Sequence, residues 1–216
     1  MDKISCKICN NKVDIIYDEK FDNKYYSCTE CEFIFIDEDH MVSKKREVKQ
    51  YNQHENTLDN EGYVNMFKDF LNRAVLPWKD NIKKALDFGC GPGPVLKELL
   101  KSEGFDVDIY DFYFQPEKVF ENKKYDLITS TEVFEHLSEP RKTFKMLKEH
   151  LNREGILSIM TLFHTNDEED FKKWWYRRDP THISFYTPKT LKILGNIFDM
   201  KIVYIGDKNT CVFRKN

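Results

Sequence analysis

Long apolar segments are absent from this sequence. The longest apolar stretch, residues 155–163 (GILSIMTLF), is much shorter than the ~20 apolar residues that a membrane-spanning helix needs. The first residues, MDKISCKICNNK, lack the apolar core of a secretory signal peptide. Both absences argue against insertion into a membrane and against export, so we expect a soluble cytoplasmic protein with no membrane partner.

A strong charge of one sign is absent as well. Lys and Arg together number 34 and Asp and Glu 37, which gives a net charge of -3. A dedicated nucleic-acid-binding protein carries a strongly basic surface, so this balance argues against that class. Internal repeats and low-complexity tracts are also missing, and apolar residues make up 40% of the chain, which is typical of globular proteins. A length of 216 residues suffices for one ordinary domain and a small appendage.

Cysteine, by contrast, is concentrated near the start of the sequence. Cys6 and Cys9 form one C-x2-C pair, and Cys28 and Cys31 form a second pair. This spacing matches a four-cysteine zinc site, and a cytosolic protein keeps such thiols reduced. The flanking segments resemble short strands, so we predict a zinc ribbon whose zinc is structural, because four cysteines leave no open position. Two local disulfides, or a ribbon without metal, are the alternatives.

The remaining chain divides into a linker and a main domain. Residues 38–60 are polar and offer at most a short helix, and Tyr51 and His54 within them are candidates for a lid. Apolar residues then recur at helical spacing from Tyr63 to Val75. We therefore predict a zinc ribbon at 1–40, a linker or lid at 41–60 and a main domain at 61–216.

Strand and helix patterns alternate through the main domain. Short apolar runs predict strands at 84–88, 106–111, 125–130 and 156–162, and helical patterns fill 93–104 and 139–155. Thr187 is placed to cap a helix that begins at Pro188, and residues 200–215 resemble two strands around a turn. The alternation predicts an α/β fold, a Rossmann-like, doubly wound and mostly parallel sheet with an antiparallel C-terminal hairpin.

A glycine-rich loop, LDFGCGPGP, lies between the first strand and helix of this domain. Ligands of open α/β sheets bind beyond the carboxyl ends of the strands, which is where this loop should lie. Gly89, Gly91 and Gly93 let the backbone approach a ligand closely. Asp87 adds a carboxylate at the end of its strand, and Asp111 is placed to accept hydrogen bonds from a ribose diol. A dinucleotide-binding loop is the rival, but its third glycine comes one residue later.

The D-x-G-x-G-x-G spacing, followed by an acidic residue after the next strand, resembles class I S-adenosylmethionine-dependent methyltransferases over residues 60–216. The whole chain, ribbon included, is similar to bacterial zinc-ribbon proteins of the Methyltransf_23 kind. The resemblance implies that the three glycines line the methionine and ribose of S-adenosylmethionine and that Asp111 holds the ribose. It also implies that Phe112 lies near the adenine and that Thr131 and Glu132 flank the sulfonium. Residues 112–124 depart from the family pattern, because they offer no clear third strand.

The stretch TEVFEHL places three polar groups together. If it is helical, Glu132, Glu135 and His136 share nearly one face. Its E-x-x-E-H pattern resembles small-RNA 2′-O-methyltransferases and ubiquinone-pathway O-methyltransferases, in which such residues and a later histidine hold a divalent metal. His182 could supply that histidine. In the metal-free alternative, Glu132 serves the cofactor and His136 acts as base or substrate contact, and a structural role is the third alternative. We predict Glu135, His136 and His182 as the catalytic residues.

A second dense segment, FKKWWYRRDPTHISFY, combines aromatic and basic residues. Trp175, Tyr176 and Arg178 are candidates to bind a substrate that is sugar-like or anionic, and a helix with a solvated basic face is the alternative. No N/D-P-P-Y or Pro-Cys motif follows the TEVFEHL strand, which argues against several N- and C5-methylating classes. We therefore predict methylation of a hydroxyl, or of another heteroatom or carbon, on a small metabolite. The alternatives are an RNA methyltransferase that binds RNA through its ribbon and a non-catalytic module that recruits a protein partner.

Overall fold

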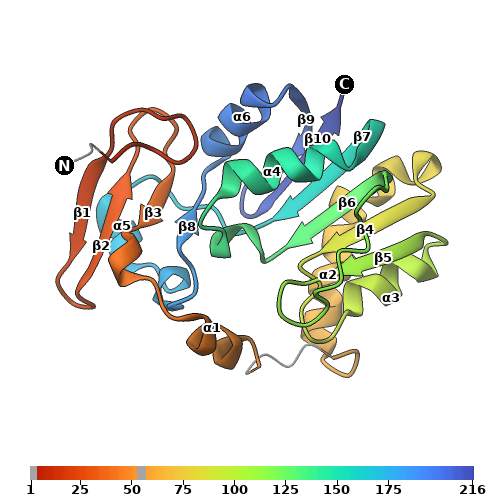
Figure 1. Ribbon diagram of the computed structural model, residues 1–216, viewed down its shortest axis with the longest axis horizontal. Helices are drawn as coiled ribbons and strands as arrows, with labels where there is room; N and C mark the ends of the chain where they lie inside the picture. Colours follow the sequence, from red (N-terminus) through yellow and green to blue (C-terminus); the bar gives the residue numbers. More distant parts are fainter. Residues whose placement is uncertain (1–3, 53–56) are drawn as a thin grey trace.

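Two β-sheets stand at opposite ends of the molecule. The computed structural model describes residues 4–52 and 57–216, so His54 of the predicted lid lies outside the described residues. A four-stranded sheet lies at one end and a six-stranded sheet at the other, with α1 (Lys44–Tyr51) running beneath the space between them (Figure 1). Among the described helices, none is long and apolar enough to cross a bilayer.

The smaller sheet is the ribbon sheet. Its strands are antiparallel throughout, in the order β1-β2-β3-β8, and the first three come from the predicted ribbon. The fourth, β8, comes from the main domain 61–216 and pairs Ile34 with Phe185. The ribbon sheet therefore includes a strand from outside residues 1–40, and the predicted domain boundary at residue 40 stays a prediction. The bounds are β1 (Asp14–Asp18), β2 (Asn23–Ser27), β3 (Ile34–Ile36) and β8 (Ser184–Phe185).

The larger sheet confirms the predicted α/β class. Its strand order is β5-β4-β6-β7-β10-β9, with four parallel strands followed by a C-terminal hairpin in which β10 is antiparallel to both β7 and β9. Its strands are β4 (Lys84–Phe88), β5 (Asp106–Tyr110), β6 (Tyr125–Thr131), β7 (Leu151–Met160), β9 (Met200–Ile205) and β10 (Thr210–Lys215). The first strand of this sheet in the sequence, β4, lies between β5 and β6, so the loop that follows β4 emerges within the parallel part of the sheet.

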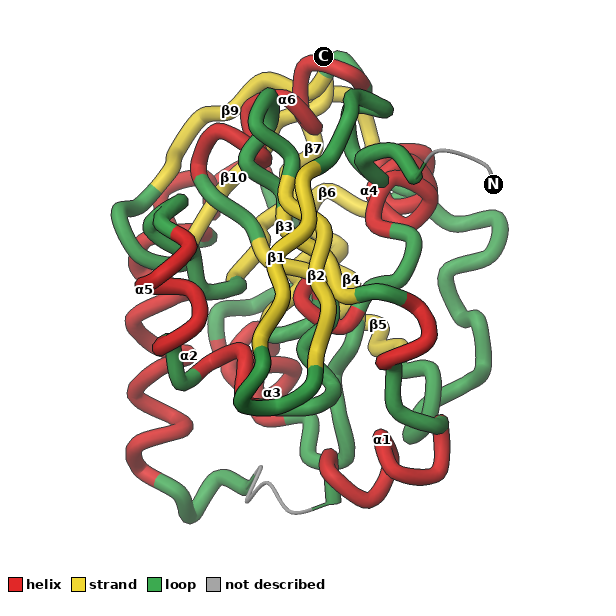
Figure 2. The backbone as a smooth tube through the Cα atoms, turned by 90° about the vertical axis from the view of Figure 1, so that its left-hand side faces the viewer, coloured by secondary structure: helices red, strands yellow, loops and turns green. Residues whose placement is uncertain are grey.

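Helices cover both faces of the larger sheet. On one face α2 (Glu61–Ala74) and α3 (Val95–Ser102) bury an apolar cluster that includes Phe70 and Leu100. On the other face α4 (Pro140–Glu149) and α6 (Pro188–Ile197) bury a second cluster that continues into the ribbon and reaches its cysteines. The view from the ribbon end shows the ribbon strands standing in front of the larger sheet (Figure 2). The ribbon therefore shares a core with the main domain.

Three predicted elements can be compared directly with the structure. The Thr187 cap is confirmed, because its hydroxyl accepts from the Thr190 N–H at the start of α6. No helix or strand occurs in the fully described stretch between β5 and β6, so the third strand of the family pattern is missing. The helix predicted over 139–155 is wrong in its second half, because α4 ends at Glu149 and residues from Leu151 onward belong to β7. Gly155, the last residue of that predicted helix, lies in β7, where a Cβ would come within 2.9 Å of the Asn152 carbonyl and 3.1 Å of the Tyr125 carbonyl.

Candidate active site and metal centres

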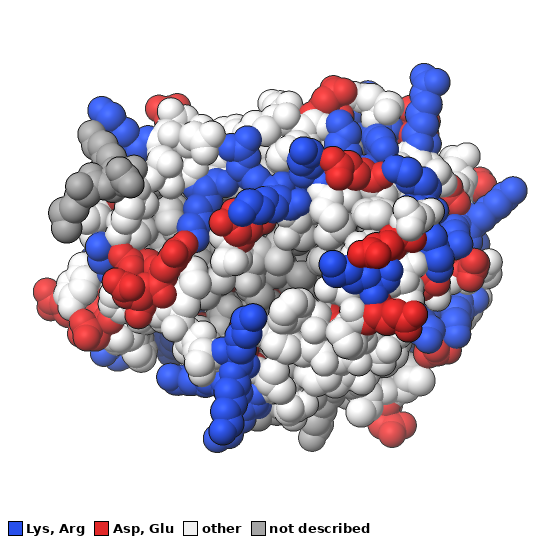
Figure 3. Space-filling view, in the orientation of Figure 1, with Lys and Arg blue, Asp and Glu red and all other residues white. Residues whose placement is uncertain are grey.

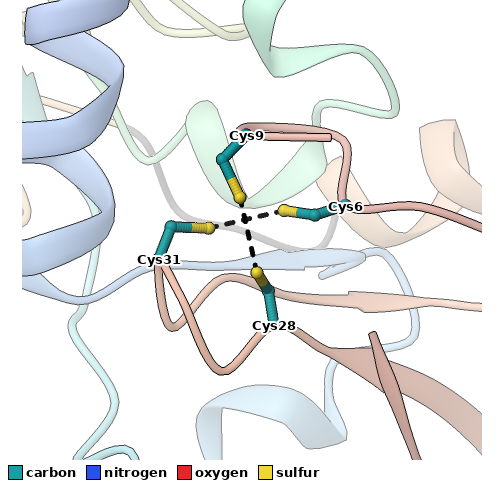
Figure 4. Close-up of side chains that lie close together, drawn as sticks. All are labelled: Cys6, Cys9, Cys28 and Cys31. Carbon is teal, nitrogen blue, oxygen red and sulfur yellow. Dashed lines mark hydrogen bonds between the residues drawn. The ribbon is translucent and has the colours of Figure 1, made fainter. Parts of the chain in front are cut away.

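The two C-x2-C pairs converge on one point. The Sγ atoms of Cys6 and Cys31 lie 3.4 Å apart, and those of Cys9 and Cys28 lie 3.5 Å apart (Figure 4). A tetrahedral ion with Zn–S bonds of ~2.3 Å separates its sulfur ligands by ~3.8 Å, close to these distances. All six cysteines of the chain are free thiols, so local disulfides do not form in this structure. The four sulfur atoms make a cluster that can bind zinc, with no position left for substrate.

The glycine loop after β4 is held against the end of β5. The N–H groups of Gly89 and Cys90 donate to the Tyr110 carbonyl at 2.7 and 3.1 Å. The N–H of Gly91 donates to Asp111 at 3.0 Å, and the other carboxylate oxygen of Asp111 accepts from two backbone N–H groups of its own loop. Gly89 and Gly91 adopt φ values of 85° and 65°, which only glycine tolerates easily. The loop is therefore held by backbone hydrogen bonds at the edge of the cavity described next, where Gly89, Gly91 and Gly93 present no side chain.

One cavity of about 1130 Å³ contains every predicted site residue except the cysteines. The face drawn in Figure 3 is hollowed near its centre, between the ribbon and the larger sheet, and Lys and Arg alternate with Asp and Glu around it. The cofactor residues predicted from the family resemblance line one part of the cavity: Asp87, Gly89, Gly91, Gly93, Asp111, Phe112, Thr131 and Glu132. The other part is lined by the residues predicted for catalysis and substrate binding: Glu135, His136, Trp175, Tyr176, Arg178 and His182.

Asp87 is the buried carboxyl group of the cofactor side. It accepts a hydrogen bond from the Thr129 hydroxyl at 3.0 Å. Burial, with a smaller contribution from the nearby Asp111 charge, raises the pKa of Asp87 to about 7. A cationic ligand beside it would favour the ionised form. The strand end therefore offers a carboxylate that a positively charged group can recruit.

TEVFEHL is not the helix we predicted. Thr131 ends β6, Glu132 adopts φ 53°, and only Phe134–His136 form a short 3-10 turn. The Glu132 N–H donates to the Met160 carbonyl at 2.8 Å, so the chain leaves the sheet through a sharp bend. This bend, rather than a helical face, directs Glu132, Glu135 and His136 into the cavity.

Tyr176 joins the two glutamates. Its hydroxyl donates to Glu135 at 2.5 Å and lies 3.3 Å from Glu132. Desolvation, followed by the charge of Glu135, raises the pKa of Glu132 well above its usual range. Burial therefore disfavours the ionised form of Glu132. No hydrogen bond from a described residue reaches Oε2 of Glu135, although that side chain is fully buried.

Two histidines complete the acceptor side of the cavity. Nδ1 of His136 lies 2.9 Å from the Thr181 carbonyl, and Nδ1 of His182 lies 2.7 Å from the Tyr176 carbonyl. A carbonyl only accepts, so both Nδ1 atoms carry a proton, and in the neutral form of each ring Nε2 has the lone pair. One ligand atom each from Glu135, His136 and His182 fall within 4.8 Å of one another. Glu132, the fourth predicted ligand, lies outside this group.

The three predicted substrate-binding residues are placed differently. Trp175 is 65% exposed and Arg178 is exposed, and both line the cavity. Tyr176 is buried, and its hydroxyl is bound to the glutamates. It therefore supports the acceptor side from behind, while Trp175 and Arg178 remain open to a ligand.

The α1 helix contacts the cavity through several side chains, of which the sequence predicts only Tyr51, as a candidate for a lid. The Tyr51 ring stands edge-on to His136, with centroids 5.2 Å apart. Glu47 accepts from the hydroxyls of Tyr51 and Tyr113 at 3.2 and 2.5 Å. Gln50 donates to Asp179 at 3.1 Å. The side chains of α1 form no apolar stripe and are all half-buried or exposed, so no periodicity could have placed this helix over the cavity.

Comparison with known proteins gives a consistent result. The family described as methyltransferase domain matches residues 59–204. No curated protein matches the sequence. A putative sarcosine dimethylglycine methyltransferase from Galdieria sulphuraria superposes with a TM-score of 0.55 at 14% identity, covering 82% of this chain and 92% of that one. Magnesium protoporphyrin IX methyltransferase from Synechocystis PCC 6803, solved with bound S-adenosylhomocysteine, gives 0.54 at 15% identity, covering 82% and 89%.

An O-methyltransferase family protein from Burkholderia thailandensis gives a TM-score of 0.53 at 13% identity, covering 70% of this chain and 55% of that one. The chain thus spans about half the length of several solved structures that it matches. At these identities the likeness shows a shared fold, and the predicted Rossmann-like class is confirmed.

Proposed function

Since this chain belongs to the methyltransferase-domain family, we propose that it transfers the methyl group of S-adenosylmethionine to a hydroxyl group of a small molecule. The observation that carries the proposal is the pair of Nε2 lone pairs on His136 and His182, which border the cavity next to Glu132 and the glycine loop. An acceptor hydroxyl needs such a group, because its proton must leave when the oxygen is methylated.

The cofactor occupies the side of the glycine loop. Gly89, Gly91 and Gly93 leave room for the methionine and ribose, and Phe112, which is exposed, offers a flat face for the adenine. Asp111 borders the same space. Thr131 and Glu132 line the boundary between the two sides of the cavity, where the sulfonium would meet the acceptor. Burial and the nearby charge of Glu135 both raise the pKa of Glu132, which disfavours a second negative charge beside Glu135.

The acceptor occupies the side of the histidines. Neutral imidazoles accept protons readily near neutral pH, and burial lowers the pKa of His182, which favours its neutral form. Trp175 can stack on a sugar or ring, and Arg178 can pair with a carboxylate or phosphate. These residues favour a sugar-like or anionic metabolite as the acceptor.

A divalent ion at Glu135, His136 and His182 is the second candidate for the same step. The donor set fits, because two imidazoles have their Nδ1 fixed by carbonyls and a buried carboxylate has an unpaired oxygen. Bound there, an ion of this kind supplies Lewis acidity that lowers the pKa of a hydroxyl group. The ribbon cysteines hold a separate structural zinc.

The test compares histidine variants in a transfer assay. Purified protein is incubated with methyl-labelled S-adenosylmethionine and a panel of hydroxyl-bearing sugar phosphates, hydroxy acids and phenols. His136→Gln and His182→Gln should each lower transfer at least ~100-fold, the range of general-base loss, without loss of S-adenosylhomocysteine binding. His150→Gln is the matched control, since its Nδ1 also bonds a carbonyl, that of Lys123, away from the cavity. Full transfer by both variants, or transfer to amines alone, would refute the proposal.

Metal analysis separates the two candidates. If Glu135, His136 and His182 hold an ion, the wild-type chain binds one metal more than the His182→Gln variant, and chelation stops transfer in the wild type. Equal metal content in the two proteins would remove the ion from the mechanism and leave the imidazoles as proton acceptors.

A further inference from the structure

The segment that carries His182 completes the ribbon sheet. β3 pairs with β8, and the Ile36 N–H donates to the Ile183 carbonyl at 3.0 Å. The Ile183 N–H donates in turn to the Glu135 carbonyl at 2.8 Å. Ile183 is thus hydrogen-bonded to the ribbon through its carbonyl and to the acceptor-side turn through its amide. This one residue links the ribbon to the turn that carries Glu135.

A buried ion pair connects the same segment to the far end of the ribbon. Nη1 of Arg177 lies 2.6 Å from Oδ2 of Asp18, at the end of β1, and these side chains are only 1% and 6% exposed. Nε of Arg177 donates to the Phe171 carbonyl at 2.7 Å, at the end of α5 (Glu168–Lys173). A buried charge without its partner is strongly unfavourable, so this pair favours a single geometry of the chain on both sides.

The zinc-binding end of the ribbon provides a third connection. The Thr190 hydroxyl donates to the Cys31 carbonyl at 2.8 Å, and Nε2 of His164 donates to the Glu32 carbonyl at 2.8 Å. The Thr187 hydroxyl donates to the Glu32 carboxylate at 2.9 Å. The ribbon therefore contacts residues 164–190 at both ends and through strand pairing between them. Figure 1 shows α5 and β8 lying beside the ribbon strands.

We propose that the ribbon is a positioning element of the acceptor site and that Asp18 and Arg177 are its positioning residues. Neither of these two side chains lines the cavity. Arg177 instead follows Tyr176, whose hydroxyl binds Glu135 and whose carbonyl fixes the Nδ1 proton of His182. Holding Arg177 therefore holds the orientation of His182. The inference rests on the proposed function in that it places the acceptor beside this histidine.

A purely structural ion pair makes a different prediction. If Asp18 and Arg177 only stabilise the ribbon, weakening them lowers the stability of the chain and leaves the hydrogen bond between His182 and Tyr176 intact while the chain is folded. If they position the segment, that bond is lost in a folded chain. The distinction can be read from the imidazole N–H protons, which are protected when bonded to a carbonyl.

The experiment uses protein labelled with ¹⁵N-histidine and records imidazole N–H signals by NMR. Among the histidines that the structure describes, four have an imidazole nitrogen bonded to a backbone carbonyl: His136, His150, His164 and His182. Asp18→Asn should abolish or broaden the His182 signal and leave the distant His150 signal unchanged. S-adenosylhomocysteine should bind this variant as it binds the wild type, because the glycine loop belongs to the other sheet.

Two further variants keep the result decisive. Glu38→Gln breaks an exposed ion pair with Lys7 inside the ribbon and should change none of these signals. Arg177→Lys keeps a charge opposite Asp18 but removes the guanidinium fork, so it should also cost the His182 signal; it decides the matter if Asp18→Asn does not fold. The proposal is overturned if the folded variants keep the His182 signal, or if the His150 signal changes with it. Failure of the wild type to bind S-adenosylhomocysteine would instead refute the proposed function.

Discussion

Replacing Gly89 with alanine should destabilise the protein and weaken cofactor binding together. Gly89 has φ +85°, and a Cβ built there would lie 2.2 Å from Cγ2 of Val133, inside the TEVFEHL stretch. An alanine in the left-handed region costs roughly 1–2 kcal/mol. Overpacking against a fixed neighbour costs a further ~1–3 kcal/mol. We therefore expect the free energy of unfolding to fall by about 2–5 kcal/mol.

Gly104 supplies the matched control. It has φ +93°, but no described heavy atom lies within 4 Å of its built Cβ. Gly104→Ala should therefore lose only the conformational part, roughly 1–2 kcal/mol. The difference between the two variants measures the clash with Val133 alone.

Two assays together check this reasoning. Urea unfolding followed by circular dichroism gives the stability of each variant, and calorimetric titration with S-adenosylhomocysteine gives the affinity. A loop pushed away from the Tyr110 carbonyl should bind at least ~10-fold more weakly, since each ~1.4 kcal/mol is a factor of ten. Equal destabilisation of the two variants, with unchanged affinity in Gly89→Ala, would refute the contact between the loop and Val133.

Three further outcomes are expected. Cys28→Ser, or removal of zinc with a chelator, should lower the melting temperature measured by calorimetry, because ~40 residues of ribbon cannot fold on apolar burial alone. A zinc-free chain that melts like the wild type would contradict the zinc site. Burial raises the pKa of Asp87 to about 7, so between pH ~4 and ~7 the folded carboxyl keeps a proton that the unfolded chain releases, and the free energy of unfolding should decrease over this range by at most ~1.4 kcal/mol per pH unit. Asp87→Asn should flatten this slope in urea titrations at several pH values. An identical slope in the variant would show that another group is responsible. Gly62→Ala should add up to ~1 kcal/mol of stability near the start of α2, because its Cβ meets Asn60 at an ordinary 3.5 Å; a loss measured by the same unfolding assay would contradict the helical start.

Features encoded by neighbouring residues were predictable from the sequence. The ribbon cysteines, the glycine spacing and the Thr187 cap each depend on a few adjacent positions, and the structure has all three. The order of strands and helices was also predictable, because apolar periodicity reports it directly. The missing third strand could be inferred from thirteen residues too short for a helix and a strand.

Features that depend on distant contacts were not predictable. The turn at Phe134–His136 follows from a bend at Glu132, which the backbone adopts to bond Met160 across the sheet. Arg177 belongs to the aromatic and basic segment that suggested either substrate binding or a solvated basic face, and its burial depends instead on Asp18 in another part of the chain. A two-residue strand such as β8 leaves no pattern to read.

The pairing of β3 with β8 has a consequence for the order in which the newly made chain can fold. Ile34 opposes Phe185, so the ribbon leaves the ribosome long before the strand that completes its sheet has been synthesised. The edge of β3 is then an unpaired row of N–H and C=O groups until residues 184 and 185 have been made. An early metal-bound hairpin would hold that edge in shape, and a delay in translating residues 37–183 would extend the time during which the edge can aggregate.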